Sequence, residues 1–162
     1  MILFTALLPP EDVVTALEAE LARQGVDQAL RWSSPSNWHV TLAYYGDVPE
    51  IPDLALSGRP APRLWIEGAG TFPGVLWLNV AGEELAELAS AAGAGADGRK
   101  YRSHLTLARY AKEDPDAGKA WAERLMAFRT EPWVAREAVL MRSDRDERGT
   151  TYRVVERYPL NG

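Results

Sequence analysis

The chain has 162 residues, of which 46% are hydrophobic and 25% charged, a balance typical of one soluble globular domain. Its formal net charge of -5 argues against sequence-independent binding to long nucleic acid, but is compatible with a small phosphorylated ligand or one RNA end in a local pocket. The chain has no cysteine, which excludes disulfides, thiolate nucleophiles and thiolate zinc sites, and we expect a cytoplasmic location. No apolar run approaches the ~18 residues of a membrane-spanning helix.

The first part of the chain predicts a strand, a helix and a second strand. Residues 2–8 form an apolar run typical of a buried strand, without the basic start and cleavage site of a signal peptide. Pro10 suits the first turn of a helix, which we expect to end near Gly25. A strand is then predicted at 39–45, and the four prolines between residues 48 and 62 indicate a loop.

The remaining elements follow from shorter patterns. We expect strands at 63–67, 75–80, 101–110, 134–141 and 150–158, and helices at 83–92 and after Asp114. Asp114 is predicted to cap the last helix, with Pro115 in its first position.

One order of elements occurs twice, namely a strand, a helix and a strand that begins with histidine. This repeat predicts two similar halves related by a pseudo-two-fold axis. We therefore expect an α+β fold in which residues 1–162 form a single two-lobed domain, each half having an antiparallel sheet and flanking helices around a central cleft.

The only two histidines open the matching tetrapeptides His39-Val40-Thr41-Leu42 and His104-Leu105-Thr106-Leu107. Eight of the 162 residues are threonine, so a threonine two places after both histidines would arise by chance roughly once in four hundred sequences. In a strand the histidine and threonine share one face and the apolar residues share the other. Two such strands facing each other would therefore place two imidazoles and two hydroxyls around one small volume.

These side chains fit phosphate chemistry. A pair of imidazoles can act as base and acid near neutral pH, and threonine hydroxyls can donate to phosphate oxygens. A metal-dependent hydrolase is a competing interpretation, but neither histidine has an HxH or HxxxH partner, and carboxylates would have to complete the site. We therefore predict no metal and no other cofactor.

Residues 31–46, which read RWxxPxNWHVTLxYxG, resemble the first motif of the two-histidine phosphoesterases, and HLTLAR at 104–109 resembles the second. More narrowly, the chain resembles the bacterial and archaeal RNA 2',3'-cyclic phosphodiesterases once called 2'-5' RNA ligases. Further landmarks include Ser143 and Tyr152, so the resemblance covers nearly the whole chain. The chain departs from the family at Ser103, where proline is common.

The resemblance implies that the protein opens a terminal 2',3'-cyclic phosphate to a 2'-phosphate without a metal. We assign His39 as the acid and His104 as the base, although the pseudo-symmetry leaves the reverse assignment open. Thr41, Thr106 and, as in relatives, Arg109 are expected to bind phosphate.

Three side chains need further comment. Arg109 lies five places after His104, so it reaches the cleft only if the strand ends or bulges near Ala108; a solvated surface position is the alternative. Phe4 and Tyr44 are candidates for stacking on a base, with core packing as the alternative. Trp32 and Trp38 are expected to be scaffold.

The expected partners are RNA ends or small nucleotides that carry a cyclic phosphate, with no membrane contact and a monomeric chain. Two other functions remain open, a non-catalytic module that binds RNA ends or nucleotides and a reversible 2'-5' RNA ligase. Turnover of a 2',3'-cyclic nucleotide would distinguish an enzyme from the binding module.

Overall fold

The computed structural model describes residues 1–25 and 27–162, which form an α+β fold with one curled antiparallel sheet. The strands are β1 (Ile2–Leu7), β2 (Arg31–Trp32), β3 (Val40–Asp47), β4 (Arg63–Phe72), β5 (Val75–Glu83), β6 (His104–Arg109), β7 (Trp133–Val134), β8 (Glu137–Asp146) and β9 (Gly149–Pro159). The helices are α1 (Glu11–Gln24), α2 (Leu85–Ala92) and α3 (Asp116–Leu125), with a short 3-10 helix η1 (Pro35–Asn37). None of the helices in this part of the chain is long and apolar enough to cross a membrane.

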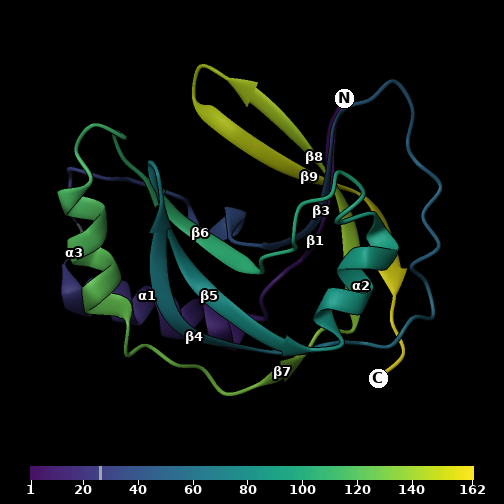
Figure 1. The fold of residues 1–162 in the computed structure, drawn as a ribbon, viewed down its shortest axis with the longest axis horizontal. Helices are drawn as coiled ribbons and strands as arrows, with labels where there is room; N and C mark the ends of the chain where they lie inside the picture. Colours follow the sequence, from purple (N-terminus) through teal and green to yellow (C-terminus); the bar gives the residue numbers. More distant parts are fainter. Residues whose placement is uncertain (26) are drawn as a thin grey trace.

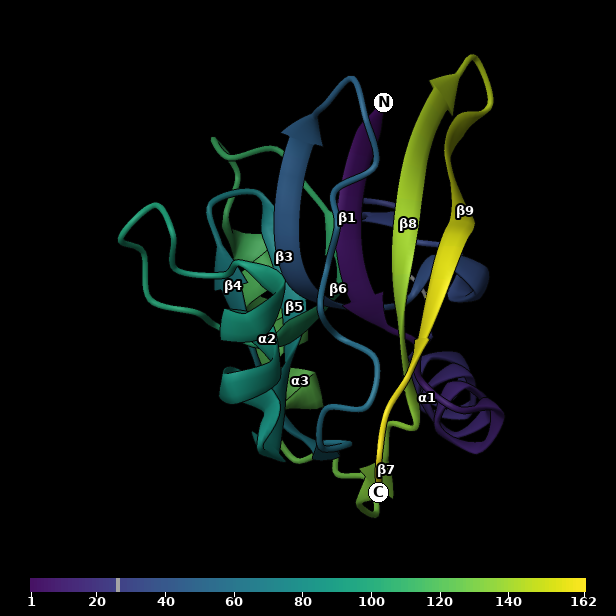
Figure 2. The ribbon, with the colours of Figure 1, turned by 90° about the vertical axis from the view of Figure 1, so that its right-hand side faces the viewer.

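The strand order confirms the predicted repeat. The sheet runs β7-β4-β5-β6-β3-β1-β8-β9, with β2 paired to the free side of β6. The first half has β1, α1 and β3 in that order, with β2 and η1 between α1 and β3, and in the second half β5, α2 and β6 follow one another. Figure 2 shows β3, β1, β8 and β9 side by side, whereas β4, β5 and β6 form the other wall of the curled sheet in Figure 1. The strands of the two halves therefore belong to one continuous sheet.

A single antiparallel pair, Val40 with Leu105, joins β3 to β6 at the centre of the sheet. Both residues are buried, and each directly follows a histidine. On either side of this pair the two strands separate, because β3 continues along β1 and β6 along β5. The join therefore holds the two histidine segments together and leaves open space between the sheet walls.

Both histidine strands carry a one-residue bulge at the same place in the motif. In β3, Leu42 is the extra residue between the two pairs Thr41 with Ala6 and Ala43 with Thr5. In β6, Leu107 is the extra residue between the pairs that Thr106 and Ala108 make with β5. A bulge shifts the alternation of side chains by one position. In each strand the leucine and the following alanine are consequently both buried, and the residue after them is exposed.

Several sequence-based boundaries need correction. The predicted helix at 83–92 begins at Leu85, because β5 continues beyond the predicted strand at 75–80 as far as Glu83. The predicted strand at 134–141 is in fact two strands, because β7 ends at Val134 and pairs with β4 whereas β8 begins at Glu137 and pairs with β1. The predicted strand at 63–67 extends to Phe72, because a bulge at Gly68, whose φ is 90°, interrupts the alternation without ending the strand.

The predicted cap of the last helix is also wrong by one residue. The backbone N–H of Asp114 donates to Ala111 over 3.0 Å in a turn, so the chain is not yet helical there. Pro115 occupies the N-cap position, and its carbonyl accepts the first helical bond from Lys119. Trp121 and Leu125 of α3 are buried in the core.

Glycine is required on α3 where this helix packs against the end of β6. A Cβ atom at Gly118 would lie 2.4 Å from ring atoms of Tyr110, and the Tyr110 hydroxyl is anchored by donation to the Phe72 carbonyl over 3.1 Å. We therefore expect Gly118→Ala to lower the free energy of unfolding by about 1–3 kcal/mol, because overpacking outweighs the better helix propensity of alanine. Urea denaturation measures this change.

The matched control for this prediction is Lys119→Ala, at the exposed neighbouring position of α3. It should change the free energy of unfolding by no more than about 0.5 kcal/mol. A Gly118→Ala variant as stable as the original chain would show that Tyr110 moves aside easily, and would contradict the packing described.

Candidate active site

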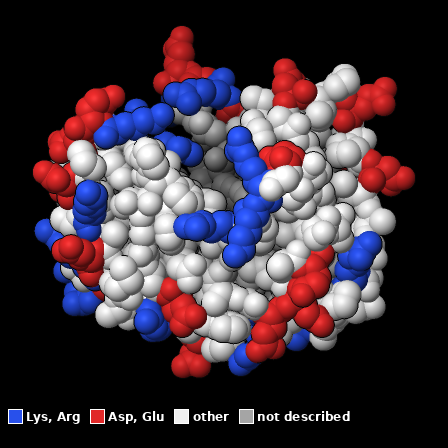
Figure 3. Space-filling view, in the orientation of Figure 1, with Lys and Arg blue, Asp and Glu red and all other residues white. Residues whose placement is uncertain are grey.

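A cavity of about 860 Å³ opens between the two halves, and Figure 3 shows a hollow bordered by Lys and Arg side chains on this face. All seven site residues expected from the sequence line the cavity: Phe4, His39, Thr41, Tyr44, His104, Thr106 and Arg109. Their convergence from both halves results from the join between β3 and β6.

The two imidazoles are held in the same way. Nδ1 of His39 lies 2.8 Å from the carbonyl oxygen of Asn37, and Nδ1 of His104 lies 2.9 Å from the carbonyl oxygen of Arg102. Each ring therefore donates through Nδ1 to the backbone two residues earlier. This bond selects the tautomer that is protonated on Nδ1, which leaves Nε2 as the nitrogen that can gain or lose a proton.

The register at the join, extended by one residue in each direction, relates each histidine to the threonine of the other half. Because Val40 faces Leu105 in an antiparallel pair, the next positions outward match His39 with Thr106 and Thr41 with His104. The flanking side chains point to the face opposite the buried valine and leucine. The cavity therefore has an imidazole and a hydroxyl from each strand in alternating positions.

Two hydrogen bonds fix Thr41. Its Oγ1 lies 3.1 Å from Nε2 of His39, which confirms that the histidine and threonine of this motif share a face. Its backbone carbonyl accepts a 2.7 Å bond from the hydroxyl of Tyr101. Burial raises the pKa of Tyr101, so this phenol stays protonated and ties the segment before β6 to β3.

Aromatic rings surround His39. The ring of Phe4 lies 4.9 Å from the imidazole, centroid to centroid, and Tyr152 meets it edge-on at 5.2 Å. This burial lowers the pKa of His39 below the ordinary 6.5, with a smaller contribution in the same direction from the nearby charge of His104. The bond to the Asn37 carbonyl acts in the opposite direction but does not reverse the shift. His39 is therefore mainly neutral at pH 7.

Different aromatic rings flank His104. Phe72 meets its imidazole edge-on at 5.3 Å and Trp77 lies 6.3 Å away. The guanidinium of Arg102 lies 5.8 Å from the Phe72 ring centroid, which fixes the residue whose carbonyl holds His104. Ser103 uses its hydroxyl to bond the Val80 carbonyl, so the serine at this position anchors the start of β6 to β5.

Arg109 reaches the cavity because of the bulge in β6. The sequence predicted a bulge near Ala108 as the condition for this position, and the extra residue is Leu107. Tyr44 occupies the equivalent position in β3, five places after His39 and beyond the bulge at Leu42. The same position therefore carries a cation in one half and an aromatic ring in the other.

The aromatic candidates differ in exposure. Tyr44 is 68% exposed and can offer its ring to a ligand, whereas Phe4 is only 4% exposed and contacts His39 and Tyr152. The two tryptophans predicted as scaffold have different positions. Trp38 is buried in the core, and Trp32 packs edge-on against Trp121 while also bordering the cavity.

Several cavity residues were not singled out from the sequence. Arg31 comes from β2, Asn37 from η1, and Arg145, Arg148 and Thr150 from the turn region of β8 and β9. Arg31 belongs to the motif at 31–46 and could have been found there. The last three reach the cavity only through long-range strand pairing, for which the sequence offers no local signal.

The cavity lining is electropositive although the chain is acidic overall. Four arginines line it, and among the described residues that line it there is no aspartate or glutamate. The described part of the chain also holds no cluster of three or more His, Cys, Asp or Glu side chains suited to a metal ion. An anion is consequently the ligand favoured by the charges of the cavity.

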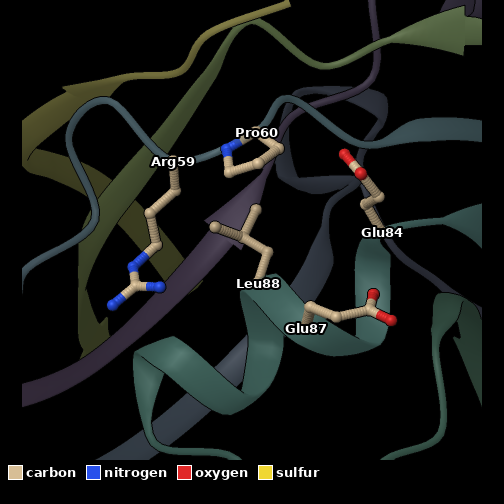
Figure 4. A pocket seen from close by; sticks show the side chains of 5 residues that line it. All are labelled: Arg59, Pro60, Glu84, Glu87 and Leu88. Carbon is tan, nitrogen blue, oxygen red and sulfur yellow. The ribbon is translucent and has the colours of Figure 1, made fainter.

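A second, smaller cavity of about 200 Å³ has a different character. Figure 4 shows it between α2 and the segment containing Arg59 and Pro60, with Glu84 and Glu87 at its edge. Its two carboxylates disfavour a phosphate, so it does not compete with the histidine cavity as the site for a phosphorylated ligand.

Comparison with protein families agrees with this geometry. Residues 39–147 match the model of the 2'-5' RNA ligase superfamily. The chain is 30% identical to an RNA 2',3'-cyclic phosphodiesterase of Thermus thermophilus, with 100% of this chain and 91% of the relative aligned. It is 27% identical to an RNA 2',3'-cyclic phosphodiesterase of Aquifex aeolicus, with 89% of this chain and 90% of the relative aligned.

Solved structures show the same fold. The crystal structure of TT0787 from Thermus thermophilus superposes with a TM-score of 0.80 at 25% identity, covering 100% of this chain and 99% of the other. Escherichia coli LigT complexed with phosphate superposes with a TM-score of 0.73 at 22% identity, covering 99% and 98% of the two chains.

The environment of His39 predicts its titration. We expect its pKa to lie below 6.5, and we expect Phe4→Leu to raise that pKa because the smaller side chain lets water reach the imidazole. NMR titration of the ring C–H signals measures both values, and the spectrum of a His104→Asn variant assigns the two histidines.

The matched control is Phe72→Leu, which changes a ring beside His104 and should leave the pKa of His39 unchanged. If the pKa of His39 in the unaltered chain is 6.5 or higher, the burial of this imidazole is not what sets its titration.

Proposed function

The chain belongs to the 2'-5' RNA ligase superfamily of two-histidine phosphoesterases, and we propose that it hydrolyses the 2',3'-cyclic phosphate at the end of an RNA to a 2'-phosphate. The observation that carries this proposal is the paired arrangement of His39 and His104. Both bond a backbone carbonyl through Nδ1, and both border one cavity lined by arginines.

The reaction needs one proton removed and one proton supplied. A neutral imidazole accepts a proton from water through Nε2 as the water oxygen forms a bond to phosphorus. The other imidazole, protonated at Nε2, gives its proton to the 3' oxygen as the bond between that oxygen and phosphorus breaks. The products are a terminal 2'-phosphate and a 3'-hydroxyl, and a second proton exchange with water restores both histidines.

We assign the base to His39 and the acid to His104, the reverse of the assignment made from sequence. Burial lowers the pKa of His39 and so favours the neutral imidazole that a base requires. His39 also lies against Phe4 and Tyr152, which exclude water from one side of the ring.

Threonine and arginine side chains stabilise the phosphate in this proposal. Thr41 and Thr106 line the same cavity as the histidines and can each donate a hydroxyl proton to a non-bridging oxygen. Arg109 supplies a guanidinium, which binds phosphate oxygens with two parallel hydrogen bonds and neutralises charge as it develops. Tyr44, with its exposed ring, can stack on the terminal base.

A 5'-hydroxyl of another RNA could take the place of water in the same site. Its attack would form a 2'-5' linkage and release the same 3' oxygen, so the reversible ligase is a variant of this chemistry. Analysis of the reaction products separates the two outcomes, because ligation lengthens the RNA and hydrolysis does not.

The first test is turnover of a short RNA that ends in a 2',3'-cyclic phosphate, with EDTA in excess. We expect a 2'-phosphate product and a bell-shaped dependence of kcat/KM on pH. His39→Ala and His104→Ala should each lower kcat by about 10²–10⁴-fold, because each removes one proton-transfer group. Chromatography against 2'- and 3'-phosphate standards identifies the product.

The matched control is Arg153→Ala, on the face of β9 opposite Tyr152, which should retain activity. A non-catalytic module would give no turnover in the unaltered chain. Loss of activity with EDTA, a 3'-phosphate product, or activity in the double histidine variant would each refute the proposed mechanism.

The second test separates acid from base with a substrate in which sulfur replaces the 3' bridging oxygen. A thiolate leaves without being protonated, so the substrate no longer needs the acid. We expect the fold-loss of activity caused by His104→Ala to be at least about ten times smaller on the sulfur substrate than on the oxygen substrate. His39→Ala should lose the same activity on both.

The reverse pattern would restore His39 as the acid. Equal losses for both variants on both substrates would mean that neither histidine protonates the leaving group.

A further inference from the structure

The hairpin formed by β8 and β9 extends beyond the strand that supports it. β1 pairs with β8 from Val139 to Ser143, whereas β8 and β9 remain paired as far as Asp146 and Gly149. Figure 1 shows this end of the hairpin projecting past the rest of the sheet. The residues from 144 to 151 therefore continue one wall of the active-site cavity outward.

The two faces of this extension differ in their charged side chains. Ser143, Arg145 and Thr150 line the cavity, as does Arg148 at the turn. On the opposite face Arg142 forms an ion pair with Asp144 at 2.9 Å. We call the set Ser143, Arg145, Arg148 and Thr150 the hairpin arginine face.

The two arginines of the hairpin arginine face have no carboxylate partner within the described part of the chain. Of the two acidic residues in the turn, Asp146 accepts a 2.8 Å bond from the backbone N–H of Arg148, and Glu147 forms no ion pair with a described residue. Arg145 and Arg148 are both exposed. Two unpaired guanidinium groups on a cavity wall are suited to bind phosphate oxygens, with hydroxyls of serine and threonine beside them.

The position of these arginines relative to His39 selects the kind of ligand. Met141 of β8 pairs with Phe4, whose ring contacts His39. Arg145 lies four residues further along β8, which is about 13 Å at the rise of a strand. A cyclic mononucleotide has a single phosphate, and the proposed reaction holds that phosphate between the histidines. Further phosphates are available near Arg145 only if the ligand is a longer strand.

We propose that the hairpin arginine face binds the backbone phosphates upstream of the reacting nucleotide, so that the substrate is a single-stranded RNA end of several nucleotides and not a mononucleotide. This inference rests on the proposed function and specifies its substrate. A groove that combines cations with an exposed aromatic ring, here Tyr44, is the usual means of binding a single strand without reading its sequence.

The test compares two substrates and two double variants. The substrates are a tetranucleotide RNA that ends in a 2',3'-cyclic phosphate and a 2',3'-cyclic mononucleotide. The test variant is Arg145→Ala/Arg148→Ala. The matched control is Arg142→Ala/Arg153→Ala, which removes the same charge from the outward face of the same hairpin, where these two residues are register partners.

We expect the test variant to lose about tenfold in kcat/KM on the tetranucleotide, mainly through KM. This loss should be at least about five times larger than its loss on the mononucleotide. The control should change the ratio between the two substrates by less than about twofold. The salt dependence gives a second readout, since losing two phosphate contacts should lower the slope of log KM against log salt by about 1.4.

Equal losses on both substrates would overturn the proposal, because the arginines would then act on the reacting phosphate. A loss equal to that of the control would also overturn it, because net charge alone would explain the effect.

A binding measurement keeps this test independent of catalysis. Fluorescence anisotropy of a labelled tetranucleotide with a terminal 3'-phosphate should show weaker binding to the test variant than to the control. If the unaltered chain shows no turnover but this difference in binding is present, the proposed hydrolysis is refuted, and the proposed phosphate binding by the hairpin arginine face is supported. If the two double variants bind the oligonucleotide equally, the hairpin arginine face fails whether or not turnover occurs.

Discussion

The pairing of Val40 with Leu105 is the contact on which the arrangement of the site depends. It joins β3 of the first half to β6 of the second, and both side chains are buried in the common core. Because strand side chains alternate, burying these two residues turns the histidine and threonine on either side of each toward the opposite face. A shift of one residue in this register would exchange the faces of one strand and turn its histidine and threonine toward the core. The burial of the apolar residue inside each motif therefore directs the neighbouring histidine and threonine side chains toward the cavity.

The paired bulges extend this orientation further along each strand. Without them, the residue five places after each histidine would face the core. With Leu42 and Leu107 as extra residues, Tyr44 and Arg109 turn to the cavity instead. The burial of leucine and alanine in succession is the trace of the bulge in both strands. The repeated residue pattern of the two motifs is thus accompanied by a repeated β-bulge in the backbone as well as by repeated side chains.

Local patterns predicted much of this site, and the remainder depended on pairing between distant segments. Histidine and threonine two places apart need only the period of a strand, and the spacing of Arg109 showed that a bulge was required. Arg145 and Arg148 were not predicted, because their position follows from the register of β8 against β1, more than a hundred residues away in sequence. The assignment of His39 as the acid, which the sequence left open to reversal, is replaced in our proposal because the rings around His39, which come from distant segments, lower the pKa of its imidazole.

The unlike residues at the equivalent bulge positions have a consequence for the polarity of a bound strand. Two imidazoles related by a pseudo-two-fold axis could accept a cyclic phosphate in either of two orientations, exchanging the roles of the two halves. Tyr44 in one half and Arg109 in the other make these orientations unequal, because one side offers a surface for a base and the other a charge for a phosphate. If the proposed function holds, this difference between two halves with similar backbones would let the chain distinguish the 3' end of a bound strand from its 5' side.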